Sequence, residues 1–264
     1  MKRRRLLYLK SVAYDSMNQE ILDYLRPFLD EKTDLEVKSI IKGTSHMEYH
    51  FYQAVNQREI LKEILQAEKD GFDACIISCF DDPSLYEARE ISKDIIVTAP
   101  GEASAYLAAV LGDKFSVIVG RKKWIPQMEE NIHKYGLGRK LASFRSLDLG
   151  VLEFHENEAE TRSRMEEEIC RAVEEDRAEV IILGCTMQFG FYQEMQEKFH
   201  IPVIDSMVAA VKQAEYLVEM KEKTGWTFSR IGLYERPPEE EMKAWNLEQV
   251  CDLEGLLYRE GERS

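Results

Sequence analysis

Two cysteines of this chain follow apolar runs of strand length, and their thiols are the groups best placed to do chemistry. Cys79 comes directly after Ala74–Ser78 in CIISCFDDP, and Cys185 comes shortly after Val180–Leu183 in LGCTM. In an open α/β sheet ligands bind outside the carboxyl ends of the strands, so both thiols are expected at a ligand-binding edge. Because thiolate is the reactive form of cysteine, one sulfur could remove a proton from a carbon while the other thiol returns a proton to the opposite face.

The chain also repeats itself around these two cysteines. A shift of 106 residues lays EKDGFDACIISCF (68–80) over EEDRAEVIILGCT (174–186), so that Cys79 falls on Cys185. The same shift lays IIVTAP (95–100) over IPVIDS (201–206). Identity between the halves is low, so the repeat is an argument about topology. It predicts two similar α/β halves that present the two thiols to a ligand from opposite sides of a cleft.

The residues after each cysteine are expected to leave the strand in a turn and to start a helix, near Asp82–Glu87 and near Thr186–Phe191. Free backbone N–H groups at such a place can hold a carboxylate or an imide oxygen. The same helix ends are expected to lower the pKa of the thiols toward neutrality. Asp82 is expected to cap the helix that follows it, with Pro83 in the first turn. Both acids are interpreted as structural, since an anion beside a thiolate raises the pKa of the thiol.

Seven clear apolar runs alternate with longer stretches of helical period. The predicted strands are Leu6–Leu9, Leu35–Ile41, Ala74–Ser78, Ile95–Thr98, Phe115–Val119, Val180–Leu183 and Pro202–Ile204, with a weaker one at Gly150–Phe154. The predicted helices are Asn18–Leu29, Tyr49–Lys69, Ser104–Leu111, Trp124–Tyr135, Glu158–Glu175, Gly190–Phe199 and Met207–Lys221. Unbroken Val/Ile runs indicate strands that are buried on both faces, as in parallel sheets covered by helices.

This alternation predicts an α/β fold of two similar pseudo-symmetric lobes, each a parallel sheet flanked by helices, with the active site in the cleft between them. The first lobe is expected to hold residues 1–99 plus 208–264, which include a C-terminal crossing helix and tail. The second lobe is expected to hold residues 100–207. The tail after Gly225 is polar and is predicted to be irregular.

The composition restricts the partners. The chain has 264 residues and a formal net charge of -14, from 35 Lys+Arg against 49 Asp+Glu, which disfavours nucleic acid. It lacks an apolar run long enough to span a bilayer, so no membrane is expected. Five scattered cysteines are typical of a reduced, cytoplasmic protein. An acidic α/β protein of this size is also expected to form a homo-oligomer.

The remaining motifs are interpreted as structural. Cys75, Cys170 and Cys251 are expected to act as small hydrophobic side chains. No metal site is expected, because the C-x3-C spacing that ends at Cys79 has no second pair and HMEYH (46–50) is not a zinc-binding motif. Nucleotide-binding glycine motifs and the G-x-S-x-G motif are absent. Glu102 is expected to cap its own helix rather than to contact a ligand.

Four stretches together resemble the aspartate/glutamate/hydantoin racemase superfamily, and most closely its hydantoin racemases. They are CFDDP (79–83), PGEASAY (100–106), LGCTM (183–187) and IPVIDSMVAAVKQAE (201–215). The resemblance implies a racemase with two catalytic cysteines, Cys79 and Cys185, that needs no pyridoxal phosphate, other cofactor or metal. It implies a small-molecule substrate, a hydantoin or a related amino-acid derivative. The polar atoms of that substrate would be bound by the backbone amides of Phe80, Asp81, Thr186 and Met187.

The chain departs from the hydantoin racemases at positions that contact the substrate in that family. KSVAY (10–14) replaces an Asn-Pro-Asn-Thr turn, so Ser11 would contact the substrate. Gly120–Arg121 replaces a threonine, and Ser84 replaces a glycine. These departures leave the substrate open. Lys10 or Arg121 could pair with a substrate carboxylate that a hydantoin lacks, or each could be a solvated surface charge.

Other members of the superfamily remain alternatives. The same fold supports maleate-type cis–trans isomerases, which use two cysteines, and arylmalonate-type decarboxylases, which use one. A non-catalytic binding protein would explain the missing turn after the first strand, although both cysteines are retained. Glutamate racemase is disfavoured, because Met187 stands where that enzyme has a histidine after Gly-Cys-Thr.

Overall fold

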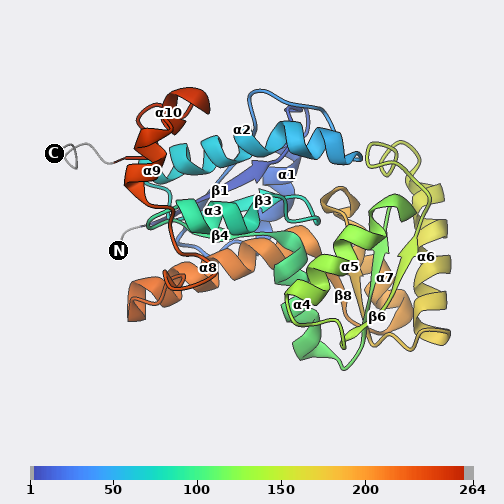
Figure 1. Cartoon of the computed structure of the whole chain (residues 1–264). Helices are drawn as coiled ribbons and strands as arrows, with labels where there is room; N and C mark the ends of the chain where they lie inside the picture. Colours follow the sequence, from blue (N-terminus) through green and yellow to red (C-terminus); the bar gives the residue numbers. More distant parts are fainter. Residues whose placement is uncertain (1–2, 259–264) are drawn as a thin grey trace. The chain divides into compact units, whose positions relative to one another are not determined.

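The computed structural model describes residues 3–258 and shows two four-stranded sheets, each flanked by helices (Figure 1). The described chain divides into two compact units. The first holds the described residues of Met1–Ile77, Pro83–Thr98 and Ala214–Ser264. The second holds Ser78–Asp82 and Ala99–Gln213. The segment 78–82, which carries Cys79, is thus grouped with the second unit, whereas the sequence suggested the first lobe. The lobe boundaries drawn from the sequence stay a prediction.

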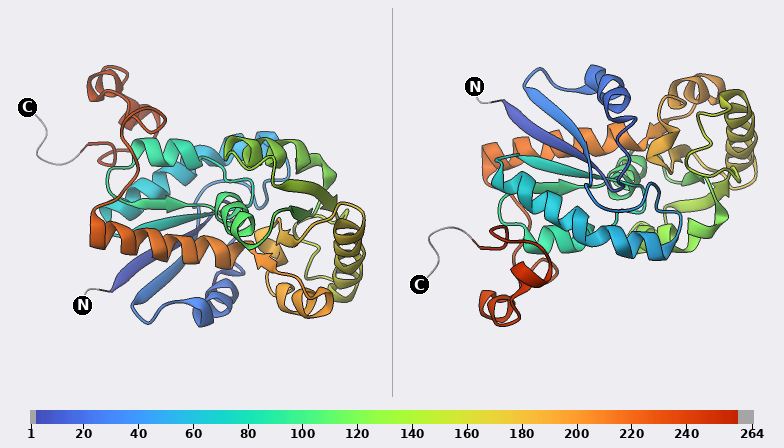
Figure 2. Two further views of the ribbon diagram at one scale, coloured as in Figure 1. Left: turned by 90° about the horizontal axis from the view of Figure 1, so that it is seen from below. Right: turned by 90° about the horizontal axis from the view of Figure 1, so that it is seen from above.

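The first sheet has the strand order β2-β1-β3-β4. Its strands are β1 (Arg4–Lys10), β2 (Thr33–Ser39), β3 (Ala74–Ser78) and β4 (Ile96–Thr98). The pairs β1–β2 and β3–β4 are parallel. Apart from those of the C-terminal tail, the helices of this unit are α1 (Asn18–Leu25), the 3-10 turn η1 (Arg26–Phe28), α2 (His50–Lys69), α3 (Leu85–Ile91) and the part of α8 (Ser206–Thr224) from Ala214 on. Figure 2 shows α2 and α8 along opposite faces of this sheet, so helices cover both faces.

The second sheet has the equivalent strand order, β6-β5-β7-β8, with parallel neighbours throughout. Its strands are β5 (Phe115–Val119), β6 (Leu141–Ser146), β7 (Val180–Leu183) and β8 (Val203–Asp205). Its helices are α4 (Pro100–Leu111), η2 (Lys122–Trp124), α5 (Ile125–Lys134), α6 (Glu158–Glu174), η3 (Thr186–Gln188), α7 (Tyr192–Phe199) and the start of α8. Because β7 takes the place in this sheet that β3 takes in the first, the predicted repeat and fold class are confirmed.

The inner strands are buried along their length, as their apolar sequences predict. Every residue of β5 and of β7 is buried, because α4 packs against one face of the sheet while α6 and α7 cover the other. Phe154, Met165, Ile169 and Met195 pack against β5 and β7 in one apolar core. When helices cover both faces of a sheet, the sequences of its strands are unbroken apolar runs. This core holds the carboxyl end of β7 in place.

One strand and the tail differ from the sequence-based expectation. The weak run Gly150–Phe154 forms turns, so the predicted strand there is wrong, and the fourth strand is β6 instead. Each residue of β6 is half-buried at the edge of the sheet, so its apolar pattern is faint. The tail is also less irregular than predicted, since it contains α9 (Glu239–Ala244) and α10 (Leu247–Val250). Its Leu253 and Leu257 pack against Leu65 of α2.

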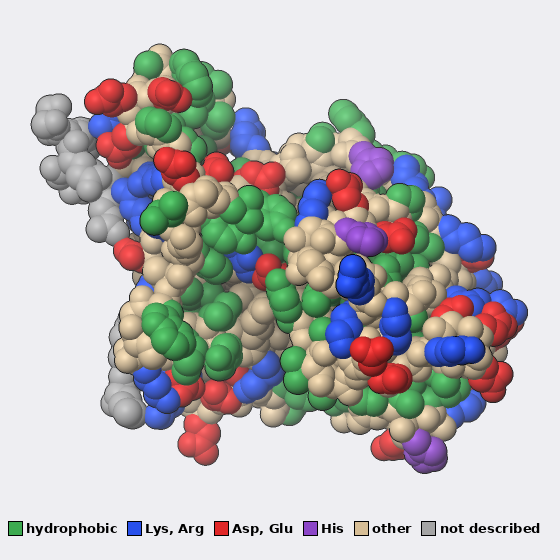
Figure 3. All heavy atoms as spheres, turned by 60° about the horizontal axis from the view of Figure 1, so that its bottom comes forward, with side chains coloured by type: hydrophobic (Ala, Val, Ile, Leu, Met, Phe, Trp, Pro, Cys, Tyr) green, Lys and Arg blue, Asp and Glu red, His purple; other side chains and the backbone are tan. Residues whose placement is uncertain are grey.

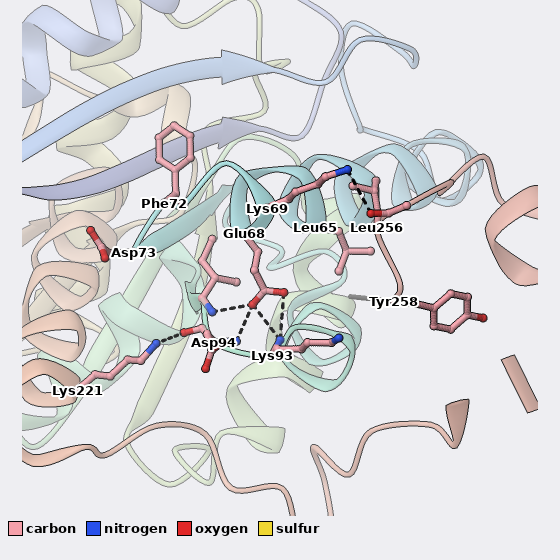
Figure 4. A pocket seen from close by; sticks show the side chains of 13 residues that line it. Leu65, Glu68, Lys69, Phe72, Asp73, Lys93, Asp94, Lys221, Leu256 and Tyr258 are labelled. Carbon is pink, nitrogen blue, oxygen red and sulfur yellow. Dashed lines mark hydrogen bonds between the residues drawn. The ribbon is translucent and has the colours of Figure 1, made fainter. Parts of the chain in front are cut away.

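The first unit contains a hollow of about 560 Å³ near the amino ends of β3 and β4 (Figure 4). It is lined by Leu65, Glu68, Lys69, Gly71, Phe72, Asp73, Lys93, Asp94, Ile95, Lys221, Gly255, Leu256 and Tyr258. The Glu68 carboxylate accepts hydrogen bonds from the backbone N–H groups of 93–95. Three lysines and three acids share the lining, so its charge favours no particular class of ligand. In α/β sheets ligands bind at the opposite, carboxyl ends of the strands.

Acidic and basic side chains are interspersed on the face that Figure 3 shows, and no broad basic surface is present there. This pattern agrees with a net charge of -14. Within residues 3–258, no helix combines the length and the apolar character that crossing a membrane requires.

Candidate active site

The two cysteines singled out by the sequence occupy equivalent places in the fold. Cys79 directly follows β3, and Cys185 follows β7 after one intervening glycine. Both side chains are half-buried and neither forms a disulfide. The charge of Cys185 is one of the causes that raise the pKa of Cys79. The two sulfurs therefore lie within electrostatic range of each other.

Each cysteine opens a turn of the same hydrogen-bonding pattern. The Asp82 N–H donates to the Cys79 carbonyl at 3.0 Å, and the Gln188 N–H donates to the Cys185 carbonyl at 2.9 Å. In both cases the bond runs from the third residue after the cysteine back to the cysteine, as in a β-turn. We call these segments the Cys79 turn (79–82) and the Cys185 turn (185–188). Their likeness extends the repeat from the strands to the candidate site.

The middle amides of these turns are the groups predicted to bind the substrate. Among the described residues, the backbone N–H groups of Phe80, Thr186 and Met187 have no hydrogen-bond partner. The Asp81 N–H interacts with the Cys79 sulfur and lowers the pKa of that thiol. Successive N–H groups of a turn form a small concave site for an anionic or polar oxygen. Each turn thus offers amide donors beside a thiol.

A side chain from another element holds the carbonyl that follows these amides. In the Cys79 turn, Asn131 Nδ2 donates to the Asp81 carbonyl at 2.9 Å. In the Cys185 turn, His155 Nε2 lies 3.0 Å from the Met187 carbonyl oxygen, to which it can only donate. Both carbonyls belong to the second residue after the cysteine, so the two turns are fixed at the same point.

Asp82 caps a helix, but not the one predicted. Its buried carboxylate accepts from the Gly101 N–H at 2.7 Å and from the Glu102 N–H at 2.6 Å, which are in the first turn of α4. The Tyr135 hydroxyl donates to the same carboxylate at 2.7 Å. The helix that directly follows, α3, starts after Ser84 without a side-chain cap. The predicted cap for the following helix is therefore wrong, and Asp82 instead ties the Cys79 turn to α4.

Asp81 has the structural role that the sequence indicated. Gln127 Nε2 donates to its carboxylate at 2.6 Å, and its charge raises the pKa of Cys79. The acid therefore opposes the formation of a thiolate rather than assisting it.

The predicted lowering of the thiol pKa by helix ends is wrong for Cys79. Burial raises the pKa of Cys79 well above its ordinary value, and the charge of Asp81 raises it further. The interaction with the Asp81 N–H lowers the pKa, but this effect is smaller than those of burial and of the Asp81 charge. These effects together favour the neutral thiol form of Cys79.

The other predicted contact residues are placed less directly. Gly120 follows β5, the neighbour of β7, and a Cβ there would lie 2.7 Å from the Leu149 carbonyl oxygen, so packing alone requires glycine. Arg121 comes next and is half-buried. Ser11 is buried in the first unit, and its hydroxyl has no hydrogen-bond partner among residues 3–258. The role of these three residues in binding stays a prediction.

Lys10 does not lie free at the surface. Its ammonium donates to the Tyr14 carbonyl and lies 5.2 Å from the centre of the Tyr14 ring. Burial lowers the pKa of Lys10, and only 5% of the residue is exposed. The lysine is thus engaged by the loop that follows β1, and its interpretation as a solvated surface charge is wrong.

The described residues contain no cluster of three or more His, Cys, Asp or Glu side chains arranged to hold a metal ion. His46 precedes α2, which begins at His50, so the two histidines do not share a helix. The expectation that no metal or cofactor takes part stays a prediction.

Sequence reasoning missed Gln127, Asn131, Tyr135 and His155. The first three lie on or just after α5, which was predicted as a helix, but their partners are 46 to 53 residues away in the chain. His155 lies in the turns before α6, stacked against Phe191 with ring centres 5.5 Å apart. No local pattern marks such residues. Only the equivalence of the two cysteine turns indicates where to look for them.

The buried carboxyl group of Asp82 predicts a pH dependence of stability. Burial raises its pKa from 3.8 to about 7, although the hydrogen bonds from Tyr135, Gly101 and Glu102 act in the other direction. Between about pH 4 and about pH 7 the folded protein keeps a proton that the unfolded chain releases. The contribution of Asp82 to the free energy of unfolding therefore falls as pH rises through this interval and is constant above it.

Urea unfolding of the wild type and of Asp82→Asn at about pH 5.5 and about pH 8 measures this effect. The asparagine does not titrate, so the wild type should lose stability relative to the variant at the higher pH. A difference between the two proteins that is the same at both pH values would contradict the raised pKa.

Comparison with known proteins agrees with this fold. The sequence profile of the family described as Asp/Glu/Hydantoin racemase matches residues 9–214. The chain therefore belongs to this family, and the resemblance read from its cysteine motifs is confirmed. A hydantoin racemase of Pseudomonas sp. (strain NS671) is 33% identical over 75% of this chain and 78% of that protein. A hydantoin racemase of Rhizobium meliloti is 34% identical over 75% and 79%. Racemases are isomerases, so the predicted enzyme class is confirmed as well.

Solved structures show the same architecture. An allantoin racemase from Klebsiella pneumoniae superimposes with a TM-score of 0.82 at 26% identity, over 89% of this chain and 94% of that chain. A maleate isomerase from Pseudomonas putida S16 superimposes with a TM-score of 0.62 at 13% identity, over 83% and 94%. The second likeness concerns the fold alone.

Proposed function

We propose that this protein racemises 5-substituted hydantoins by means of Cys79 and Cys185. The observation that carries the proposal is the pair of equivalent cysteine turns, each with a thiol and amide donors that are not used within the turn, whose sulfurs interact electrostatically. Family membership supports the reaction class. The relatives named hydantoin racemase and allantoin racemase support the substrate class, because allantoin is itself a hydantoin with a ureido group at C5.

The reaction needs one base and one acid. The C5–H bond of a hydantoin is weakened by the adjacent C4 carbonyl, because the carbanion left after deprotonation is delocalised into that carbonyl. One cysteine thiolate takes the C5 proton, and the other thiol delivers a proton to the opposite face. The first sulfur ends as a thiol and the second as a thiolate, so the charge balances and the reverse reaction starts from the product state. No external electron sink is required.

The backbone amides of the two turns can stabilise the negative charge that develops on the substrate during the reaction. Negative charge moves from C5 to the carbonyl oxygen as the proton leaves. N–H groups that already point at this oxygen stabilise it without reorganisation, and the N–H groups of Phe80, Thr186 and Met187 are the candidates. These amides bind a neutral carbonyl oxygen without the help of a charged side chain, which suits a substrate that has no carboxylate.

The protonation state of Cys79 before the reaction indicates which cysteine acts first as the acid and which as the base. Because burial and Asp81 keep Cys79 in the thiol form, Cys79 is suited to act first as the acid. Cys185 then acts as the base toward one enantiomer. Turnover of the other enantiomer requires the reverse protonation state, with Cys79 as the thiolate.

The alternatives have less support. Maleate isomerase and arylmalonate decarboxylase share only the fold with this chain, at 13% and 15% identity. Lys10, which could have marked a carboxylate substrate, is held by Tyr14 instead. No observation on the described residues favours cis–trans isomerisation, decarboxylation or a purely binding role.

A substrate panel tests the proposal. Single enantiomers of allantoin and of several 5-alkyl and 5-aryl hydantoins are incubated with the protein in D2O, alongside maleate and an arylmalonate, and optical rotation and loss of the C5–H signal are followed. Hydantoins should racemise faster than in a control with the Cys79→Ala/Cys185→Ala double variant, which corrects for spontaneous racemisation. Conversion of maleate or the arylmalonate with inert hydantoins would overturn the proposal.

A further inference from the structure

Two side chains that are not part of the predicted chemistry hold the cysteine turns at equivalent points. We propose that Asn131 and His155 are positioning residues, Asn131 for the step at Cys79 and His155 for the step at Cys185. The proposal rests on the proposed racemase function. It extends that function by assigning one supporting residue to each half of the reaction.

Asn131 reaches the Cys79 turn from α5. Its Nδ2 lies 2.9 Å from the Asp81 carbonyl oxygen. Gln127, one helical turn earlier, donates to the Asp81 carboxylate at 2.6 Å. Residues four apart share a face of a helix, so α5 presents two amide groups to the same residue of the turn. The Cys79 turn is thereby attached to a regular element of the second unit.

His155 reaches the Cys185 turn from the segment before α6. Its Nε2 lies 3.0 Å from the Met187 carbonyl oxygen. The ring stacks on Phe191 at an angle of 22° and lies 4.7 Å from the centre of the Phe189 ring. Its Nδ1 lies 3.4 Å from a Glu158 carboxylate oxygen, on the first turn of α6. Contacts on three sides thus fix the plane of the ring and the direction of its donor.

The hydrogen bonds from Asn131 and His155 each hold one end of a peptide unit whose other end is already hydrogen-bonded within its turn. In the Cys79 turn, the peptide between Asp81 and Asp82 has its carbonyl held by Asn131 and its N–H bonded to the Cys79 carbonyl. In the Cys185 turn, the peptide between Met187 and Gln188 is held in the same way by His155 and Cys185. A peptide bonded at both ends is restricted in its rotation, so the preceding amides are held in a fixed direction. Preorganised donors of this kind stabilise developing charge without reorganisation.

Loss of one positioning residue is therefore expected to impair the reaction of one enantiomer, and loss of the other residue to impair the reaction of the opposite enantiomer. Loss of the Asn131 donor should impair the proton transfer at Cys79, whereas the proton transfer at Cys185 should be unchanged. The carbanion formed by Cys185 then returns to its starting enantiomer more often, so exchange of the C5 proton without inversion rises for that enantiomer alone. Loss of the His155 donor should produce the same defect for the other enantiomer. A role in general stability would affect both enantiomers equally.

The experiment compares Asn131→Leu and His155→Phe with two controls. His155→Phe keeps an aromatic ring against Phe191 but loses the donor, whereas His155→Gln retains a donor and should restore the wild-type behaviour. Gln193→Leu removes an exposed amide that donates a hydrogen bond to the neighbouring Tyr192 hydroxyl, and it controls for Asn131→Leu. In D2O, the ratio of exchange to inversion should rise about tenfold for one enantiomer with Asn131→Leu and for the other with His155→Phe, as expected for one lost hydrogen bond. Changes in the same enantiomer, or in neither, would overturn the assignment.

A second measurement does not depend on the substrate. Alkylation of each thiol by iodoacetamide, followed by mass spectrometry, reports the state of each turn separately. The rate at Cys79 should change at least about threefold with Asn131→Leu while the rate at Cys185 is unchanged, and the reverse should hold for His155→Phe. If these rates respond as expected but no hydantoin is exchanged by the wild type, the proposed function fails and the positioning of the two turns stands. If neither rate responds, the positioning proposal fails whatever the substrate.

Discussion

Replacement of either Cys79 or Cys185 by alanine is expected to lower the rate of racemisation by about 10³-fold or more. Each thiol serves as base in one direction and as acid in the other, so inversion in neither direction survives the loss of one sulfur. One-sided exchange should remain. Cys79→Ala still allows Cys185 to remove a proton from one enantiomer and to return a deuteron to the same face, and Cys185→Ala leaves the mirror-image activity.

Cys170→Ala is the matched control, because Cys170 is half-buried on α6 in the same unit and is not at the end of a strand. Racemisation by this variant should equal that of the wild type. Racemisation rates of the three variants, measured with one hydantoin by polarimetry, test whether Cys79 and Cys185 are the acid and the base. A Cys79→Ala or Cys185→Ala protein that folds and racemises at more than about a tenth of the wild-type rate would show that the removed thiol is not the acid or base.

Gly101→Ala is expected to damage both stability and activity. A Cβ at this position would lie 2.5 Å from the Phe80 carbonyl oxygen and 2.8 Å from a carboxylate oxygen of Asp82. The first of these atoms is backbone, and the second accepts two hydrogen bonds, from the Glu102 N–H and the Tyr135 hydroxyl, so neither can move away without cost. The added methyl group should therefore push the Cys79 turn away from α4. Overpacking of this kind costs about 1–3 kcal/mol of the free energy of unfolding.

The displacement of the turn should lower the rate of racemisation by about 100-fold, because a shift of about 1 Å in a reacting group costs rate on this order. Urea unfolding and racemisation rate are measured on the same preparation. Gly232→Ala is the control, since Gly232 has a φ of +83° and open space around it in the first unit. Its substitution should cost about 1 kcal/mol of stability through backbone strain alone, with racemisation unchanged. Equal activities of the two variants would show that the contact with Gly101 does not position the turn.

The elements that the sequence predicted best are those whose physical cause is local. β3, β5 and β7 have the predicted bounds, because strands covered on both faces by helices must be continuous in apolar residues. The positions of Cys79 and Cys185 followed from the repeat, since equivalent strands place their next residues equivalently. The turn amides were predicted from the resemblance to the racemase family. A thiol at the carboxyl end of a buried strand is a pattern that a single sequence can show.

The features that the sequence could not predict depend on contacts between distant residues. Asp82 was read as a cap because of its neighbour Pro83, but it caps α4, whose first bonded amide is 19 residues away. The pKa of Cys79 was expected to fall, whereas burial and the charge of Asp81 raise it. Ser84 shows a related effect. It has a φ of +60°, a left-handed conformation that favours glycine and that no local pattern revealed.

In the proposed mechanism, two thiols on opposite faces of the substrate carbon divide the roles of base and acid between them. The most direct test follows one pure enantiomer of a hydantoin substrate in D2O over the first few per cent of conversion, with chiral separation and mass spectrometry of both enantiomers. A two-thiol mechanism predicts that the product enantiomer carries deuterium at C5 from the start, while the recovered substrate retains hydrogen. Equal deuterium in both enantiomers, or transfer of the original hydrogen into the product, would show that a single base serves both faces and would contradict the assignment of Cys79 and Cys185 as a pair.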